Sequence, residues 1–444
     1  MRNKILTLFP LEENKRQDPE LAKFFDHTDL GALYKNIPFE ELEALLPEAN
    51  PRGRKSILSR RGMLATVFLK FHFREMSDRQ LLEQLNTNRC VQLFCGLSLP
   101  RCYMIRDRDL LWRTRSWVSR HVDLKRFQQV MFDSVRGDIE PNDLGCLLMD
   151  ATCVESRIRF PTDLGLCWEI CTRLRALVLS FDGLDKRRLP RTHEGLTSKV
   201  LAYRKRRRGA RRRERGLLRT VLGHCRKYIF ILKEKKLSDR DARYLETATT
   251  VVAQQLGRLA DPSRPIKDRI VSTHKPYLRP IVRGKAHKDV EFGAKVHLLQ
   301  IGGVNVVEHV SFDAFNECKR LIDSVSMHES FTGRIPSFLG ADGIYATNEN
   351  RLFTASKGIR TNFVRKGPAP KVAVPNENTA RSLIARARAT QMEGAFGNAK
   401  NHAGLQKLRA KTAQGEILCI YFSVWTANLQ ALASKQRRRR AAAA

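Results

Sequence analysis

Two short apolar runs, far apart in the chain, each deliver an aspartate, and this repeated pattern restricts the fold strongly. The first run is LGCLLMDATCVE, with Asp150 at the end of its apolar part. The second is IPSFLGADGIYATNENRLF, in which Asp342 follows the apolar residues. Such runs predict buried β-strands. Taken alone, Asp150 is equally well explained as a cap for the next turn. Active-site acids of α/β sheets gather at strand ends, so we predict that the two aspartates meet there.

A third acid lies in a basic helix near the C-terminus. Residues 379–405 read TARSLIARARATQMEGAFGNAKNHAGL, with apolar residues at helical spacing and Glu393 as the only carboxylate. Steps of three or four residues place Arg386, Glu393 and Lys400 on one side. By itself, this glutamate is better explained as an ion-pair partner of its basic neighbours than as a metal ligand. The two aspartates change that preference, because three convergent carboxylates repel one another unless cations lie between them.

Oxygen-only ligands of this kind favour Mg²⁺ or Mn²⁺. Two such ions about 3.5–4 Å apart activate the attacking oxygen and stabilise the leaving oxygen of a phosphodiester displacement. Asp150, Asp342 and Glu393 are therefore the predicted catalytic and metal-binding residues. Lys400 points the same way as Glu393, two turns further on, and is predicted to bind a phosphate near the scissile bond.

The charge balance points to a polyanionic partner. The chain has 81 Lys and Arg against 46 Asp and Glu, a formal net charge of +35. Self-repulsion of that size costs stability unless a polyanion binds, and nucleic acid is the commonest one. An anionic membrane surface is disfavoured because the basic clusters lack an apolar face beside them. We also predict no membrane-spanning helix and no signal peptide, since no apolar run near ~18 residues is visible.

The densest basic segment lies in a stretch of helical periodicity from about residue 162 to 260. It reads YRKRRRGARRRERG, where nine of the twelve residues 204–215 are Arg or Lys. A charge run is usually a solvated face, but arginine at this density better suits contacts with phosphate oxygens. The predicted DNA contacts here are Arg204, Arg206, Arg207, Arg208, Arg211, Arg212 and Arg213. Further DNA contacts are predicted for Arg283, Lys285 and Arg388, together with Lys400.

Residues 1–140 read as helical and contain no catalytic cluster. Within SDRQLLEQLNTNRCVQLFCGLSLP, Ser77 and Gln80 have the spacing of a capping box, and a turn at 86–88 separates two short helices. This segment is either a helix-turn-helix that enters a DNA groove or a small bundle that merely packs. The sequence supports the two interpretations equally.

The cysteines and histidines show no metal-binding motif. No two of the ten cysteines have the separation of a zinc knuckle, and Cys167 and Cys171 are simply helix neighbours. We therefore predict reduced thiols in a reducing cytosol, without a structural zinc. Trp168 is better explained as a core side chain than as a platform for a flipped DNA base.

β-structure returns after several prolines between 262 and 280. The runs VEFGAKVHLLQI and VNVVEHVSF flank Gly302 and Gly303, which predicts a hairpin. An amphipathic helix is predicted for ECKRLIDSVSMHESF and a further strand for IRTNFVRKG. These elements surround the second aspartate run, so the sheet is predicted to form the core of the catalytic part.

Four segments, taken in order, make this sequence similar to the DDE transposases of bacterial insertion sequences, of the insertion-sequence-five type. They are LLMDATCVESRIRFPTDLGL, STHKPYLRPIVRGKAHKDVEFGAKVHLL, FLGADGIYATNENR and EGAFGNAKNHAGL. The resemblance implies a ribonuclease-H-like core, dependence on Mg²⁺ and a DDE triad that maps onto Asp150, Asp342 and Glu393. It also implies that the helices of 163–265 are an insertion between the first and second strands of that core.

The predicted architecture is α/β, with a ribonuclease-H-like mixed sheet, a helical Arg-rich insertion and an all-α N-terminal domain. Its parts are an end-recognition domain at 1–140, a catalytic domain at 141–434 interrupted by 163–265, and a basic tail at 435–444. The predicted function is a prokaryotic, cytoplasmic, nucleoid-associated transposase that cuts terminal inverted repeats and joins their 3′-hydroxyls to target DNA, as a homodimer when ends are paired. Two alternatives stay open: a ribonuclease-H-like nuclease that does not join strands, and a catalytically inactive DNA-binding protein.

Overall fold

The computed structural model describes residues 18–48, 56–74, 76–100, 103–182, 187, 189–205, 210–263, 265–285, 288–367 and 377–443. The chain forms two compact units. The first unit combines the chain up to residue 156 with 295–311 and the chain from 315 onward. The second unit consists of 157–294 and 312–314.

The described residues before 140 form helices and turns and no strand. The helices are α2 (Pro19–His27), α3 (Asp29–Lys35), α4 (Phe39–Ala44), α5 (Arg60–His72), α6 (Asp78–Thr87), α7 (Arg89–Phe94), α8 (Leu110–His121) and α9 (Leu124–Val135). The predicted capping box is confirmed at the start of α6. There Ser77 Oγ accepts from the Gln80 backbone N–H, and Gln80 Oε1 accepts from that of Ser77.

Helix α7 is held within the helical core. It has six residues, of which Val91, Gln92, Leu93 and Phe94 are buried. The ring of Phe94 packs edge-on against Tyr34, and Gln92 Nε2 donates to the backbone carbonyl of Leu85. A helix with most of its surface in the core has little left to enter a DNA groove. The structure therefore favours the packed bundle over the helix-turn-helix interpretation.

The described strands form one mixed sheet. They are β1 (Cys146–Ser156), β2 (Pro280–Lys285), β3 (Lys288–Ile301), β4 (Val304–Ser311), β5 (Phe338–Gly340), β6 (Arg360–Thr361) and β7 (Lys407–Leu408). The order is β2-β3-β1-β5-β6, with β4 also paired to β3 and β7 to β1. Strands β1, β5 and β6 run parallel, whereas β3 and β4 form an antiparallel pair.

The predicted hairpin between β3 and β4 is confirmed. Gly302 and Gly303 turn the chain with φ of +55° and +83°, values that favour glycine. A side chain at Gly302 would also overlap Ile139. Beyond the hairpin, the Gln128 side chain of α9 exchanges hydrogen bonds of 2.6 and 3.0 Å with the backbone of Val307 on β4. These bonds use backbone groups that a further strand would otherwise need.

Helix α17 (Ala413–Ala443) corrects the prediction that the chain has no helix long and apolar enough to span a membrane. The part Ala413–Arg439 meets that criterion by length and composition alone, yet 67% of its apolar window is buried in the protein. Phe422 and Trp425 are fully buried. Phe422 stacks on Phe127 of α9 and contacts Phe68 of α5. The helix therefore behaves as the core helix of a folded protein.

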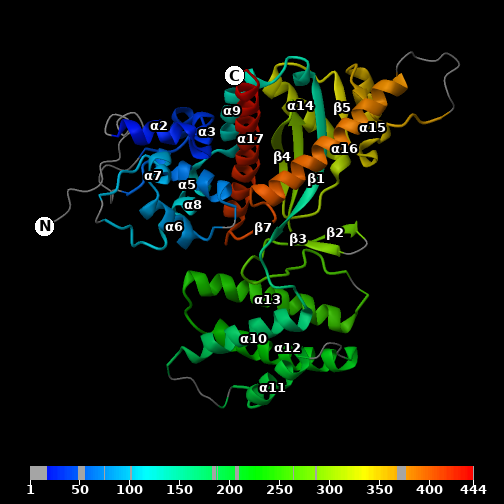
Figure 1. The fold of residues 1–444 in the computed structure, drawn as a ribbon. Helices are drawn as coiled ribbons and strands as arrows, with labels where there is room; N and C mark the ends of the chain where they lie inside the picture. The colour runs from blue at the N-terminus through cyan, green and yellow to red at the C-terminus, as the bar shows by residue number, and fades with distance from the viewer. Residues whose placement is uncertain are drawn as a thin grey trace. The chain divides into compact units, whose positions relative to one another are not determined.

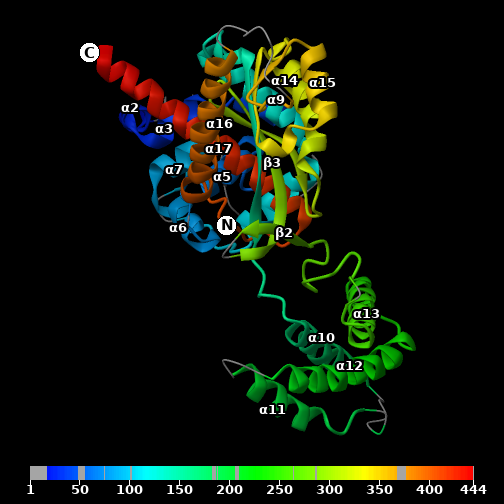
Figure 2. The ribbon, with the colours of Figure 1, turned by 90° about the vertical axis from the view of Figure 1, so that its right-hand side faces the viewer.

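Helix α16 (Glu377–His402) lies across β1 and β5 in Figure 1 and contacts both strands. Figure 2 shows α16 on one face of the sheet and the pair α14 (Leu321–Thr332) and α15 (Asn348–Ser356) on the other. Gly340 of β5 permits the close approach of α16, because a Cβ there would lie 2.7 Å from Leu148 Cδ2 and 3.1 Å from Ile384 Cγ2. The helix is thereby seated directly above the aspartate of β1.

The second unit is built mainly from four helices that lie between β1 and β2 in the chain. They are α10 (Asp163–Leu179), α11 (His193–Arg204), α12 (Arg211–Lys233) and α13 (Asp239–Ala260). Helices α12 and α13 contact each other, and α10 packs against both. The Trp168 side chain is 8% exposed and stacks on the His193 ring, which confirms its core interpretation.

Candidate active site

Asp150 lies in the middle of β1, which corrects the prediction that it ends the strand. It is the fifth of eleven strand residues. The neighbouring strand β5 pairs with β1 only as far as Leu148 and ends at Gly340. From Asp150 onward, β1 therefore has no pairing with β5, and β7 pairs with β1 only at Glu155 and Ser156. The Asp150 side chain is 19% exposed although its own strand continues.

Asp342 occupies the equivalent position after β5. Leu148 pairs with Gly340, and Asp150 and Asp342 each follow two residues later. One nitrogen, Nη2 of Arg388, lies 2.7 Å from Asp150 Oδ2 and 4.0 Å from Asp342 Oδ2. The separation between Asp150 Oδ2 and Asp342 Oδ2 is therefore no larger than the sum of these two distances.

Burial and neighbouring acids make Asp150 costly to ionise. Burial is the largest influence raising the pKa of Asp150, and the charges of Glu317 and Asp342 raise it further. The Arg388 guanidinium and the backbone N–H of Ala151 oppose this rise without cancelling it. The Asp150 side chain is 19% exposed against 60% for Asp342. The Arg388 guanidinium therefore does not fully offset the cost of ionising Asp150.

Glu393 and Lys400 are carried by α16. The helix turns Ile384, Met392 and Ala399 into the core, while Glu393 is exposed. Lys400 Nζ donates to Thr152 Oγ1 on β1 at 2.9 Å. Glu393 precedes Lys400 by nearly two whole turns, so both lie on the same side of the helix. None of the hydrogen bonds or ion pairs among the described residues joins Glu393 to either aspartate.

The structure adds an acid that sequence reasoning missed. Glu317 begins the short 3₁₀ turn Glu317–Arg320, and its Oε1 lies 2.8 Å from Lys295 Nζ. Its charge acts on Asp150 and on the nearby Tyr345, whose hydroxyl lies 2.6 Å from His297 Nε2. No local pattern marks Glu317, because only the packing of this turn against the sheet brings it to the site.

Two family models match the chain. The "Transposase domain (DUF772)" matches residues 10–117, and the "Transposase DDE domain" matches residues 339–430. The second match includes Asp342, Arg388, Glu393 and Lys400, whereas Asp150 lies outside both. The chain thus carries a transposase domain and a DDE transposase domain, which is consistent with a DDE transposase of the insertion-sequence type. No curated protein and no solved structure matches the chain.

Transposase domains imply DNA binding, and the DDE family usually uses a divalent metal. Among the arginines predicted to contact DNA, Arg204 ends α11 and three others begin α12, namely Arg211, Arg212 and Arg213; all four are exposed. Arg206, Arg207 and Arg208 lie outside the described residues. Arg283 and Lys285 belong to β2, and their side chains are likewise outside the description.

The raised pKa of Asp150 makes a stability prediction for the metal-free transposase. An acid whose pKa is higher in the folded than in the unfolded state costs stability above the folded pKa, and that cost disappears as the pH falls through it. We therefore expect Asp150→Asn to melt at a higher temperature than wild type at pH 7, with the difference shrinking towards the ordinary carboxyl pKa of 3.8.

Thermal melts between pH 4 and 8, in chelator and again in Mg²⁺, measure this effect. Mg²⁺ should stabilise wild type but not Asp150→Asn, because a ligand stabilises only the state that binds it. Glu329→Gln, an exposed acid on α14, is the matched control and should behave as wild type in both series. A variant less stable than wild type at pH 7 would contradict the expectation.

Proposed function

We propose that this transposase cuts DNA at the terminal inverted repeats of its element and joins the freed 3′-hydroxyls to target DNA. The observation that carries the proposal is the pairing of Asp150 and Asp342 at equivalent positions beside two neighbouring parallel strands. Helix α16, which carries Glu393 and Lys400, lies directly over these strands. Such an enzyme would work on the nucleoid in a prokaryotic cytoplasm.

The strand order supports a ribonuclease-H-like core. The antiparallel pair β3 and β4 lies on one side of β1, and the parallel strands β5 and β6 lie on the other. The resemblance noted from the sequence implies a core of this kind, with a DDE triad that maps onto Asp150, Asp342 and Glu393. Asp150 lies on β1, Asp342 follows β5 and Glu393 lies on α16, so all three come from elements of this sheet or the helix packed on it.

The donor set fits Mg²⁺ or Mn²⁺. Carboxylate oxygens are the ligands that these ions prefer, and the guanidinium of Arg388 already lies where positive charge is needed between Asp150 and Asp342. Asp150, Asp342 and Glu393 would hold the ions. When bound, such ions activate the attacking oxygen and stabilise the leaving oxygen in phosphodiester transfer.

The remaining side chains position the reacting groups. Arg388 orients the Asp150 carboxylate and offsets its repulsion with Asp342. A turn of its side chain away from the acids would free their oxygens for metal and present the guanidinium to a phosphate. Lys400 Nζ donates to Thr152 Oγ1, two residues beyond Asp150 on β1. In that position its ammonium group would bind the phosphate next to the scissile bond.

Joining of ends tests the proposal. The transposase is incubated with DNA duplexes that carry pre-cut element ends and with a supercoiled plasmid, in Mg²⁺ or in chelator. Plasmid covalently attached to the ends, formed only with the metal, is the expected result. Nicked plasmid without attached ends would establish the nuclease alternative, and bound but unaltered DNA would establish the inactive one.

Two ends must be held together for joining, so we propose that a homodimer assembles on paired ends. Light scattering with and without end duplexes measures the protein-to-DNA ratio of the complex. Two chains and two duplexes in one particle are expected. A complex of one chain with one duplex that nevertheless joins ends would contradict the dimer.

The arginines at the start of α12 are proposed to bind phosphates of either DNA. We expect the triple variant Arg211→Gln, Arg212→Gln, Arg213→Gln to lower the slope of log binding constant against log salt by about 0.9 for each phosphate that the variant no longer neutralises. Fluorescence anisotropy over a range of salt concentrations measures that slope. The matched triple Lys variant keeps the charges and should keep the slope, whereas an unchanged slope in the Gln variant would exclude a role for these arginines in DNA binding.

A further inference from the structure

Three helices of the second unit bring metal-ligand atoms together in their shared core. Cys171 of α10, His193 of α11 and His224 of α12 each offer one ligand atom, and these atoms lie within 4.8 Å of one another. All three side chains are buried, with His193 5% and His224 7% exposed. Buried polar groups are normally hydrogen-bonded, so each ring nitrogen in this cluster needs a partner.

Hydrogen bonds satisfy one ring nitrogen of each histidine. Nδ1 of His193 lies 3.1 Å from the Tyr228 hydroxyl, and Nε2 of His224 lies 3.1 Å from Thr192 Oγ1. Nδ1 of His224 is buried without a hydrogen-bond partner among the described residues. Histidines that bind a metal are oriented in this way, with the second nitrogen held by an outer hydrogen bond. The buried Nδ1 of His224 is therefore available to bind a metal ion.

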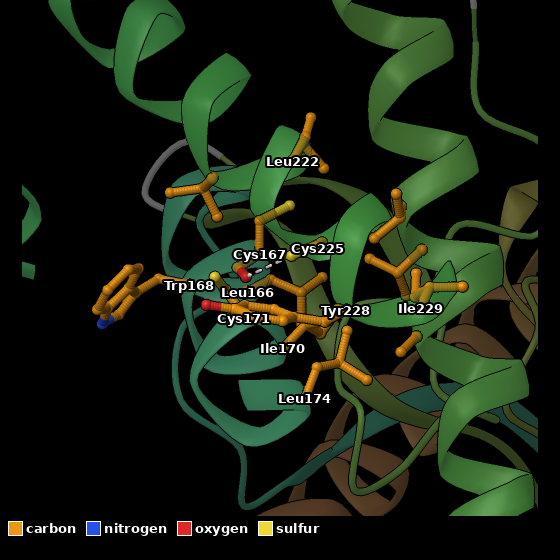
Figure 3. Close-up of a cluster of buried hydrophobic side chains, with 14 of the residues drawn as sticks. Leu166, Cys167, Trp168, Ile170, Cys171, Leu174, Leu222, Cys225, Tyr228 and Ile229 are labelled. Atoms are coloured by element: carbon orange, nitrogen blue, oxygen red, sulfur yellow. Dashed lines mark hydrogen bonds between the residues drawn. The ribbon is translucent and has the colours of Figure 1, made fainter. Parts of the chain in front are cut away.

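Further thiols lie beside Cys171. Figure 3 shows Cys167, Cys171 and Cys225 gathered next to Tyr228. Cys225 donates to the backbone carbonyl of Cys167 at 3.7 Å, and the neighbouring Cys171 thiol raises the pKa of Cys225. Cys225 is not among the three residues whose ligand atoms lie within 4.8 Å of one another, so its thiol lies beside the cluster without belonging to it.

We propose that Cys171, His193 and His224 bind one Zn²⁺, with a water molecule as the fourth ligand. Thiolate and imidazole ligands select zinc, whereas the carboxylates of the acidic site select hard cations. Zinc with its usual bond lengths holds tetrahedral ligand atoms about 3.3–3.8 Å apart, so the three clustered atoms need to close by at most about 1–1.5 Å. The Cys171 thiol loses its proton to solvent on binding. The site shares no residue with the acidic site and stands whether or not the chain joins DNA.

The zinc ion would hold α11 against α10 and α12. Of the twelve residues of α11, only His193, Leu196 and Val200 are buried, which is a small apolar anchor. A metal bond at the first residue of the helix would supply much of the missing attachment, since binding to a site that exists only in the folded state stabilises that state. It would thereby fix the helix that ends at the exposed Arg204.

Cobalt binding to the full chain tests the site. The protein is stripped with chelator under reducing conditions and titrated with Co²⁺. We expect one equivalent to produce the visible bands of tetrahedral cobalt with a near-ultraviolet thiolate band. Equimolar Zn²⁺ should remove both, whereas excess Mg²⁺ should not. Asp150→Asn should leave both unchanged, which excludes the acidic site as their origin. A wild-type chain without a thiolate band would overturn the proposal.

Ligand variants test the assignment. Cys171→Ser and His224→Gln should weaken zinc binding at least about 100-fold. Cys167→Ser, a buried thiol one turn earlier on α10, is the matched control and should keep wild-type affinity. Cys225→Ser, which removes a buried thiol beside the cluster, should likewise keep the affinity and the thiolate band. Circular dichroism establishes that each variant is folded. Folded Cys171→Ser with wild-type affinity would overturn the proposal.

Discussion

Asparagine at position 150 or 342 is expected to lower strand joining by at least about 10³-fold, which corresponds to about 4 kcal/mol of activation free energy. The substitution keeps the shape of the side chain but removes the negative charge that would hold a divalent cation. Nη2 of Arg388 lies near both carboxylates, so we expect the two substitutions to lower strand joining by similar factors. Glu393→Gln should have the same effect, although Glu393 is exposed and no hydrogen bond or ion pair among the described residues joins it to either aspartate.

The measurement is joining of pre-cut ends, with end-duplex binding measured in parallel. Binding should stay within about twofold of wild type, because DNA affinity comes mainly from phosphate contacts of basic side chains. Glu329→Gln again serves as the control acid and should join normally. Asp342→Cys adds a direct test of ligation, since a thiolate suits Mn²⁺ better than Mg²⁺ and should restore part of the activity in Mn²⁺ alone. Full activity of any of the three acid variants would remove that residue from the proposed site.

Phe422→Ala is expected to destabilise the first unit by about 3–5 kcal/mol. The ring is fully buried and stacks on Phe127 at 4.5 Å between centroids, with Phe68 at 4.8 Å. These rings belong to α17, α9 and α5, so the cavity would open where the C-terminal helix holds the N-terminal helices. Because the surrounding rings belong to separate helices, they cannot easily move to fill the cavity. The loss in free energy of unfolding should therefore lie at the upper end of this range.

Urea unfolding followed by circular dichroism measures the loss as a lower midpoint of the corresponding transition. Phe24→Ala makes the same chemical change at a side chain that is 63% exposed, and it should shift the midpoint little. A shift for Phe422→Ala as small as that of the control would mean that α17 does not depend on this contact.

Much of the local structure could be predicted from the sequence, because its causes lie within a few residues. The pair Gly302–Gly303 sets the hairpin through backbone conformations that favour glycine. Ser77 and Gln80 start α6 through their reciprocal hydrogen bonds. The run before Asp342 predicted a strand, and the structure forms β5 there. In each case the signal and the element occupy the same short stretch of chain.

Packing decided what the local pattern left open. Asp150 was predicted at the end of a strand, yet β1 continues to Ser156, and it is the earlier end of β5 that exposes the aspartate. No apolar run long enough to span a membrane was visible in the sequence because polar side chains interrupt the apolar residues of α17, yet the helix runs from Ala413 to Ala443 and 67% of its apolar window is buried. An element's length depends on the neighbours that cover it, and those neighbours come from distant segments.

The sequence by itself indicated a transposase and predicted the three acids and the basic DNA contacts, since these inferences follow from residue types and their order. Only the tertiary structure decided which groups share a site. It placed Arg388 between two aspartates, brought Glu317 to them, and gathered Cys171, His193 and His224 from separate helices. Contacts between residues far apart in the chain leave no mark at short spacing, so periodicity and motifs cannot reveal them.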